Sequence, residues 1–159
     1  MTEAKGKQGG ARVRVPPPLV FLTAVACETA LRFVIPLGQP GFSVPLLVPG
    51  AAVLAAGLAL GGAALGWFRR TKQDPKPWTP SPELILQGPY RYSRNPIYVA
   101  MMLVTAGIGV GLGSWWTLLL APGALLAVHF LAVLPEERYL AEQFGERYLE
   151  YKSRVRRYL

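Results

Sequence analysis

The chain has 159 residues, of which 52% are hydrophobic and only 16% are charged, and its formal net charge at pH 7 is +8. A soluble domain has about a quarter of its residues charged, so this composition argues against an ordinary soluble protein. The single cysteine excludes an intrachain disulfide, and the single histidine argues against a multi-histidine metal site, so no metal is expected.

The first fifteen residues are mostly polar. They include four basic side chains, Lys5, Lys7, Arg12 and Arg14. This composition predicts a disordered basic N-terminus over residues 1–15. The apolar segment that follows contains Glu28 and Arg32, which lie four residues apart and therefore on one helix face. Charges at this depth usually pair inside a bundle, so we expect a salt bridge between them, with a substrate contact as the alternative.

Four segments are nearly free of charge, namely 17–37, 44–68, 97–113 and 115–134. Each reaches at least the lower limit of about 17 residues needed to cross a bilayer. The sequence therefore predicts an all-α, polytopic integral membrane bundle with about four transmembrane helices. A buried soluble bundle is the alternative, but it requires polar helix faces that these segments lack.

Basic residues gather before the first segment, between the second and third, and after the fourth, whereas the other two connections carry no charge. The positive-inside rule places both termini and the loop 69–95 in the cytoplasm, and we expect a bacterial inner membrane. Anionic lipid headgroups account for the basic excess, so no nucleic acid partner is needed.

The loop 69–87 is rich in proline, with four prolines in the nine residues 74–82, which excludes a helix there. Long structured loops are often functional. Its last part, Glu83-Leu84-Ile85-Leu86, is a short apolar strap that we expect to lie against the bundle.

The stretch 88–98 is polar, aromatic and basic, and it runs directly into the third apolar segment. Asn95 is a good N-cap and Pro96 suits the first helical position, so a helix is predicted to begin here. The free N–H groups at the start of this helix favour the binding of an anion. The same stretch adds two positive charges, Arg91 and Arg94, and three aromatic rings with hydroxyls, Tyr90, Tyr92 and Tyr98.

The third segment ends in closely spaced glycines, and Gly107/Gly111 and Gly109/Gly113 are small-xxx-small pairs that predict helix packing. The third and fourth segments therefore form a hairpin, which brings Glu136 and Glu137 back to the depth of the stretch 88–98. We expect Pro135 to break or bend the fourth helix.

Apolar residues recur at three- and four-residue steps in the C-terminal part of the chain, at Leu140, Phe144, Tyr148, Tyr151 and Val155. This period predicts a C-terminal amphipathic helix that lies in the membrane interface.

The residues at this end of the hairpin combine donors for an anionic group with carboxylates for a cationic or hydroxylated one. S-adenosylmethionine carries a carboxylate, a sulfonium, an ammonium and a ribose, and so matches such a site. The alternative is an interfacial belt of tyrosines with arginines that reach the headgroups. His129 is a candidate general base or, alternatively, a residue of helix packing.

The stretch 88–98 (GPYRYSRNPIY), followed by 136–140 (EERYL) and 144–151 (FGERYLEY), resembles the isoprenylcysteine carboxyl methyltransferase family. That family belongs with the membrane phospholipid methyltransferases. The resemblance covers about residues 69–157. It implies a methyltransferase core at 69–159. The two N-terminal transmembrane helices expected at 16–68 resemble the family only in being hydrophobic.

The resemblance implies an S-adenosylmethionine-dependent enzyme with a lipophilic acceptor, either an isoprenylcysteine-like carboxylate or a phospholipid amine. A non-catalytic lipid-binding or assembly protein is the alternative function. The implied cofactor residues are Glu83, Leu84, Ile85, Tyr90, Asn95, Pro96, Ile97, Tyr98 and Glu136, and weaker catalytic candidates are His129, Arg94 and Glu137.

Two departures bear on these implications. Many members have histidine at the position of Asn95, and asparagine does not titrate, which argues against proton transfer there. The eukaryotic isoprenylcysteine enzymes also place an arginine about one turn before the glutamates, and this chain has none in 129–134.

Overall fold

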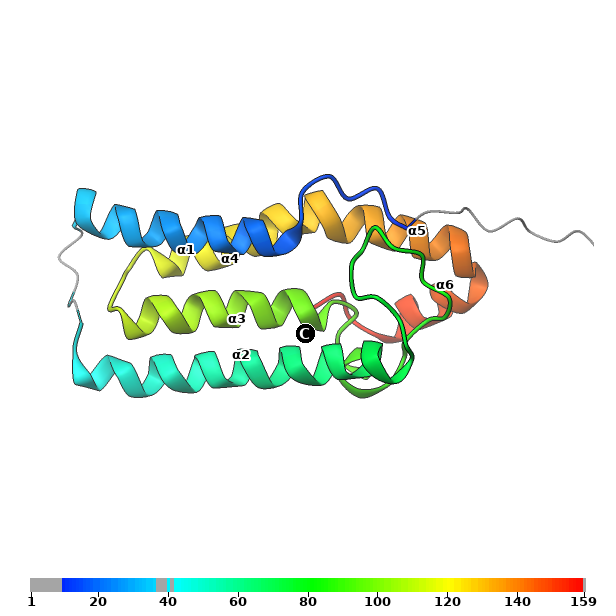
Figure 1. Ribbon diagram of the computed structural model, residues 1–159, viewed down its shortest axis with the longest axis horizontal. Coiled ribbons are helices and arrows are strands. Elements are labelled where there is room, and N and C mark those ends of the chain that lie inside the picture. The colour runs from blue at the N-terminus through cyan, green and yellow to red at the C-terminus, as the bar shows by residue number, and fades with distance from the viewer. Residues whose placement is uncertain (1–9, 37–39, 41, 159) are drawn as a thin grey trace, which may run out of the picture.

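The computed structural model describes residues 10–36, 40 and 42–158, and over these residues it contains helices and irregular segments but no strand (Figure 1). The elements in chain order are α1 (Pro17–Val34), α2 (Val44–Arg70), the 3₁₀-helix η1 (Gly88–Arg91), α3 (Pro96–Gly111), α4 (Thr117–Val128), the π-helix η2 (His129–Val133), α5 (Leu134–Phe144) and α6 (Glu146–Arg154).

Three helical runs are long and apolar enough to cross a membrane: α1, α2 and the continuous run Thr117–Phe144. The fourth apolar helix, α3, has 16 residues and is shorter than a full span. These helices confirm the predicted polytopic membrane bundle. Helix α1 ends at Val34, ahead of the predicted residue 37, because a residue before proline, here Ile35 before Pro36, disfavours the helical conformation.

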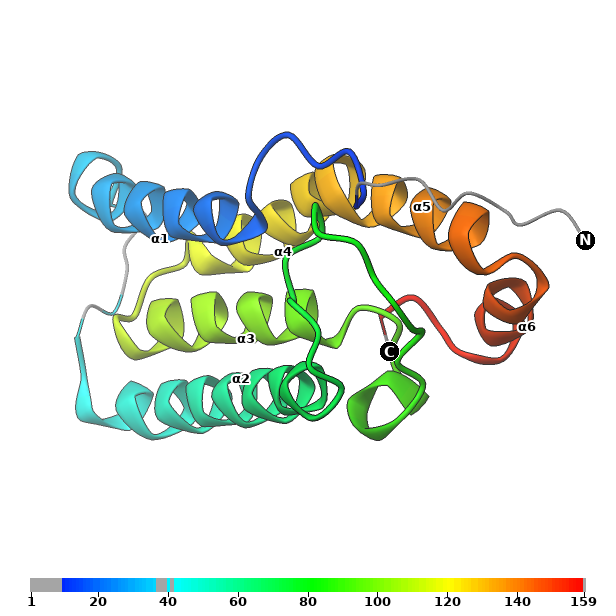
Figure 2. The same cartoon turned by 45° about the vertical axis from the view of Figure 1, so that its right-hand side comes forward.

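The four apolar helices lie side by side along the long axis of the molecule, and the α2–α3 loop, α5 and α6 gather at one end (Figures 1 and 2). The closest pair is α2 and α3. A Cβ atom on Gly107 would lie 2.5 Å from the backbone nitrogen of Leu54, so only glycine permits this approach. The predicted packing role of this glycine is confirmed.

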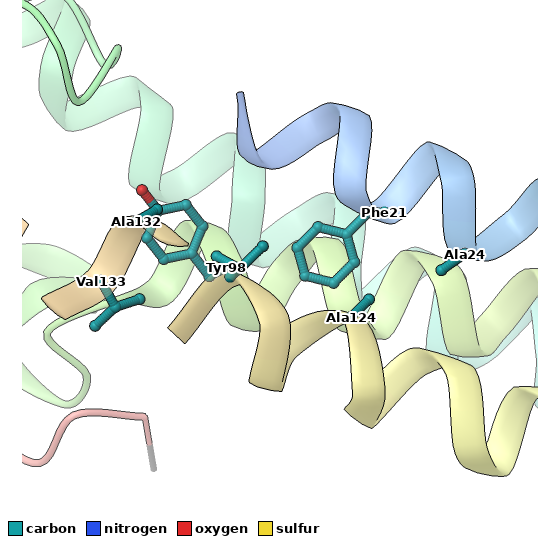
Figure 3. Packing of buried hydrophobic residues seen from close by; sticks show 7 residues of the cluster. Phe21, Ala24, Tyr98, Ala124, Ala132 and Val133 are labelled. Carbon is teal, nitrogen blue, oxygen red and sulfur yellow. The ribbon is translucent and has the colours of Figure 1, made fainter. Parts of the chain in front are cut away.

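A central core joins α1, α3 and the α4–η2 run. Phe21 of α1 packs near Tyr98 of α3 and Ala124 of α4, with Ala132 and Val133 completing the cluster (Figure 3). This core fixes the beginning of α3 against the helix that carries Glu136 and Glu137.

Pro135 does not interrupt the fourth helix, so the expected break is absent, but the run bends between α4 and α5 (Figures 1 and 2). The preceding π-turn changes the hydrogen-bond pattern, because the Leu134 N–H bonds to the His129 carbonyl, five residues back. A proline ring collides with the carbonyl four residues before it in a regular α-helix, and the wider turn accommodates this ring and its missing N–H. The helix therefore continues to Phe144.

The C-terminal amphipathic segment forms two helices instead of one, separated by Gly145 with a φ of +53°. Its apolar side chains pack against the strap, where Leu84, Tyr148 and Tyr151 are buried. The strap therefore lies on α5 and α6, and the protein itself covers much of the amphipathic face.

The expected salt bridge in α1 is absent from the described part of the chain, because no ion pair joins Glu28 and Arg32. Glu28 is 1% exposed and lies beside Gly109 and Thr117 at the α3–α4 connection. The buried Thr117 hydroxyl is the polar group next to its carboxylate, although no hydrogen bond of ordinary geometry joins them within the described residues. A spacing of four residues permits an ion pair between Glu28 and Arg32 but does not enforce one. Here Glu28 points into the bundle, towards Gly109 and Thr117.

Residues 10 and 11 lie against the α2–α3 loop, although their composition predicts disorder. The Ala11 N–H donates to the Pro77 carbonyl at 2.8 Å, and the Gly10 N–H donates to the Trp78 carbonyl at 3.2 Å. Ala11 is buried. The predicted disorder of residues 1–9 lies outside the described residues.

Candidate functional site

The loop before α3 turns sharply at Gly88, whose φ is +60° and where a Cβ atom would collide with the indole of Trp67. The chain then forms η1 and reaches Asn95 and Pro96. Pro96 is the first residue of α3, as predicted. The Asn95 carbonyl accepts hydrogen bonds from the N–H groups of Tyr98 and Val99, each at 3.2 Å.

The Asn95 side chain makes no capping bond, although a capping role was predicted. Its Nδ2 donates instead to the Arg157 carbonyl at 3.0 Å, and the Arg94 N–H donates to the Arg156 carbonyl at the same distance. The C-terminal segment 155–158 therefore holds the loop that begins α3. The asparagine amide has the donor that this contact needs.

Glu137 is buried among three cations. The Arg157 guanidinium donates two hydrogen bonds to its carboxylate at 2.9 Å each, Arg94 Nη2 lies 3.3 Å away, and Lys152 Nζ lies 3.6 Å away. Buried carboxylates are stable when they are paired in this way. Glu137 thus ties α5 to the loop and to the C-terminal segment.

Glu136 has a different environment, although it is the next residue. The Tyr98 hydroxyl donates to Glu136 Oε2 at 2.9 Å, across the hairpin. No ion pair with Glu136 occurs in the residues that the structure describes. Its carboxylate therefore remains available to a cationic or hydroxylated ligand.

Two adjoining cavities of about 230 Å³ and 60 Å³ occupy this end of the bundle. Both are lined by Phe68, Tyr90, Arg94, Asn95 and Glu136. The larger one extends between α1, α2 and α3 beneath the loop Pro75–Trp78, and the smaller one extends beneath the strap.

The nine residues predicted to bind a cofactor all line this pair of cavities. Glu83, Leu84 and Ile85 line the smaller one, Pro96, Ile97 and Tyr98 line the larger one, and Tyr90, Asn95 and Glu136 line both. The hairpin and the strap therefore bring together residues as far apart in the sequence as Glu83 and Glu136.

The three weaker catalytic candidates lie in different places. Arg94 lines both cavities and Glu137 lines the smaller one, whereas His129 lines neither. His129 Nδ1 is 2.8 Å from the Tyr158 hydroxyl, so the histidine contacts the C-terminal segment. This contact agrees with the packing alternative for His129.

Arg94 is the cation that the site leaves incompletely satisfied. Its side chain is 8% exposed, and its Nε and Nη1 have no hydrogen-bond partner among the residues that the structure describes. A buried guanidinium with free donors is costly unless an anion pairs with them. Arg91 and Tyr92, grouped with Arg94 in the sequence, are exposed and line neither cavity.

Tyr90 is buried at the junction of the two cavities, with its ring 6.0 Å from the ring of Phe68. Burial and then the nearby negative charge of Glu136 raise the pKa of the Tyr90 hydroxyl. The hydroxyl therefore remains protonated at physiological pH and serves as a donor.

Sequence reasoning missed several residues of the site. Phe68, Leu65 and Met101 were assigned only to membrane spans, and Trp78 only to a Pro-rich loop, yet all four line the larger cavity. Arg157 was assigned only to topology. A tryptophan among prolines was the one available signal, since aromatic residues in ordered loops often line sites.

A long apolar groove of about 410 Å³ continues from the site along the spanning helices. It runs between α1 and α2 over α3. Four residues, Pro18, Leu65, Ile97 and Met101, line both this groove and the larger cavity. A hydrophobic chain lying in the groove therefore has its end close to the site.

A family model described as phospholipid methyltransferase matches residues 52–147, which is more than half of the chain. The match runs from within α2 through α5, and it includes the strap, the loop before α3 and both glutamates. No curated protein and no solved structure matches the chain.

Proposed function

The chain belongs to the phospholipid methyltransferase family, and we propose from this premise that it transfers a methyl group from S-adenosylmethionine to a membrane lipid. The lipid presents either a phospholipid amine or an isoprenylcysteine-like carboxylate to the site. The observation that carries this proposal is the buried Arg94, whose two free donors line the same cavities as the Glu136 carboxylate.

The donor and acceptor groups of the site fit the polar groups of this cofactor. Arg94 offers Nε and Nη1 as two separate charge-assisted donors, which point to different sides of the guanidinium, and either one can bind a carboxylate oxygen. Glu136 offers its carboxylate to an ammonium or a ribose hydroxyl. The rings of Phe68, Tyr90 and Tyr98 provide faces for an adenine or a sulfonium.

S-adenosylmethionine supplies a methyl group that its sulfonium already activates, so the chain has mainly to position the reactants and exclude water. The hydrogen bond from Tyr98 fixes the Glu136 carboxylate, and the Glu137 carboxylate holds Arg94. Loop and strap cover the cavities from the aqueous side.

The apolar groove between α1 and α2 gives a lipid acceptor a path from the bilayer. Its walls are aliphatic and aromatic, which suits an acyl or prenyl chain. Leu65, Ile97 and Met101 line both the groove and the larger cavity, which supports the proposal that the polar end of such a lipid reaches that cavity.

The site is proposed to lie on the cytoplasmic side of a bacterial inner membrane. The start of α1, the α2–α3 loop, α5 and α6 share one end of the bundle (Figure 1). These segments carry most of the basic residues, which favours the cytoplasmic side under the positive-inside rule.

Calorimetry on the detergent-purified chain tests the proposal, with S-adenosylhomocysteine as the ligand. Glu136→Ala removes the free carboxylate, and Tyr98→Ala removes the hydroxyl that orients it. Both variants are expected to insert into membranes and to lose ligand binding. Wild-type affinity in both would overturn the site, and no binding to the wild-type chain would favour a non-catalytic lipid-binding protein.

A further inference from the structure

A separate hollow of about 460 Å³ lies where the N-terminal segment 10–14 crosses the start of α5 (Figures 1 and 2). It is lined by Gly10, Ala11, Arg12, Arg14, Pro135, Arg138, Tyr139 and Glu142. None of these residues lines the two cavities of the site. The proposed methyl transfer therefore does not account for the hollow.

Three arginines meet at the hollow from two parts of the chain. Arg12 and Arg14 are two residues apart in the N-terminal segment, and Arg138 belongs to α5. All three are exposed, and within the described residues none has an ion pair. The acidic member of the lining, Glu142, is also engaged in an interaction. Three positive charges therefore face one carboxylate, which leaves the hollow with a net positive charge.

Three arginines around one hollow favour an anionic ligand, and the position of the hollow in the bundle indicates the source of that ligand. Pro135 directly follows the apolar segment 115–134, and α1 begins at Pro17, three residues after Arg14. Both boundaries place the hollow at the depth of the lipid headgroups. Guanidinium groups bind phosphate with paired hydrogen bonds, and basic pockets at this depth bind anionic lipids.

We propose that this hollow binds the phosphate group of an anionic phospholipid of the cytoplasmic leaflet. A bound lipid holds the N-terminal segment against α5. That segment is bonded to the loop over the larger cavity, through Ala11 to Pro77 and Gly10 to Trp78, and both loop residues line the cavity. An anionic lipid thereby stabilises the covered form of the site.

Native mass spectrometry of the full chain in a neutral detergent tests the binding, with phosphatidylglycerol titrated against phosphatidylcholine. The variant R12Q/R138Q removes two of the arginines. The matched control R69Q/R147Q removes two exposed arginines that line no cavity. Each of the two arginines is expected to contribute the energy typical of a basic residue near an anionic surface. The affinity of R12Q/R138Q for phosphatidylglycerol should therefore fall about thirtyfold, and the affinity of the control should not change.

Equal weakening in the two variants, or equal binding of the two lipids by the wild-type chain, would overturn the site. Displacement of phosphatidylglycerol by an equal concentration of inorganic phosphate would overturn the lipid as its ligand. Hydrogen exchange tests the coupling, since phosphatidylglycerol should slow exchange of the Gly10 and Ala11 amides, which donate to the loop carbonyls, in the wild-type chain and in R69Q/R147Q but not in R12Q/R138Q. Neither readout requires methyl transfer, so failure here is distinct from failure of the proposed function.

Discussion

Replacing Arg94 by glutamine tests the role of the buried cation in the site. The wild-type side chain has one ion pair, from Nη2 to Glu137 at 3.3 Å, and two free nitrogens, Nε and Nη1. Glutamine keeps some of the volume but removes the charge and most of the donors. Glu137 retains Arg157 at 2.9 Å and Lys152 at 3.6 Å, so its carboxylate stays compensated and the fold is expected to survive.

A hydrogen bond to a charged group contributes about 1.5–3 kcal/mol, which corresponds to about a 10- to 150-fold loss of affinity. Calorimetry with S-adenosylhomocysteine measures this loss, and a thermal melt of each variant reports folding. Arg91→Gln is the matched control, because Arg91 lies three residues earlier and is exposed outside both cavities. Equal affinity in the Arg94 variant and the control would refute the anion-binding role.

Three further predictions follow from particular contacts. Tyr98→Phe removes the hydrogen bond to Glu136, so ligand affinity should fall about tenfold in calorimetry, and an unchanged value would contradict this role. Gly107→Ala forces a Cβ atom into the backbone of α2 and should lower the free energy of unfolding by about 1–3 kcal/mol. Gly111→Ala, where a Cβ meets nothing within 4 Å, should leave it unchanged, and equal effects in the two would refute the packing argument. Glu28→Gln should not lower the melting temperature, because the carboxylate has no ion pair among the described residues and glutamine can still bond to Thr117; a large decrease would reveal an ion pair.

The amino-acid sequence predicts the bundle and much of the site because these depend on local signals. Apolar length locates the spanning helices, and Pro96 locates the start of α3. The uncharged turn between the third and fourth segments requires a hairpin, which brings Glu136 back to Tyr98. Their 2.9 Å hydrogen bond agrees with that reasoning.

Other features depend on tertiary contacts without a local signal. The hydrogen bond from Asn95 to the Arg157 carbonyl joins residues that are 62 apart in the sequence. An asparagine before Pro96 is typical of an N-cap, so the sequence gives no sign of this long-range contact. The charges around Glu137 also come from three separate segments. The π-turn before Pro135 depends on the packing of its neighbours, since proline alone predicts a break.

Transfer of a labelled methyl group tests the central proposal most directly. The purified chain is incubated with membrane lipids and S-adenosylmethionine labelled in its methyl group, and the labelled lipid is then identified. The account predicts label in a lipid with an amine or carboxylate headgroup, and loss of that label in Glu136→Ala. Absence of lipid labelling by a folded wild-type chain that binds S-adenosylhomocysteine would contradict it.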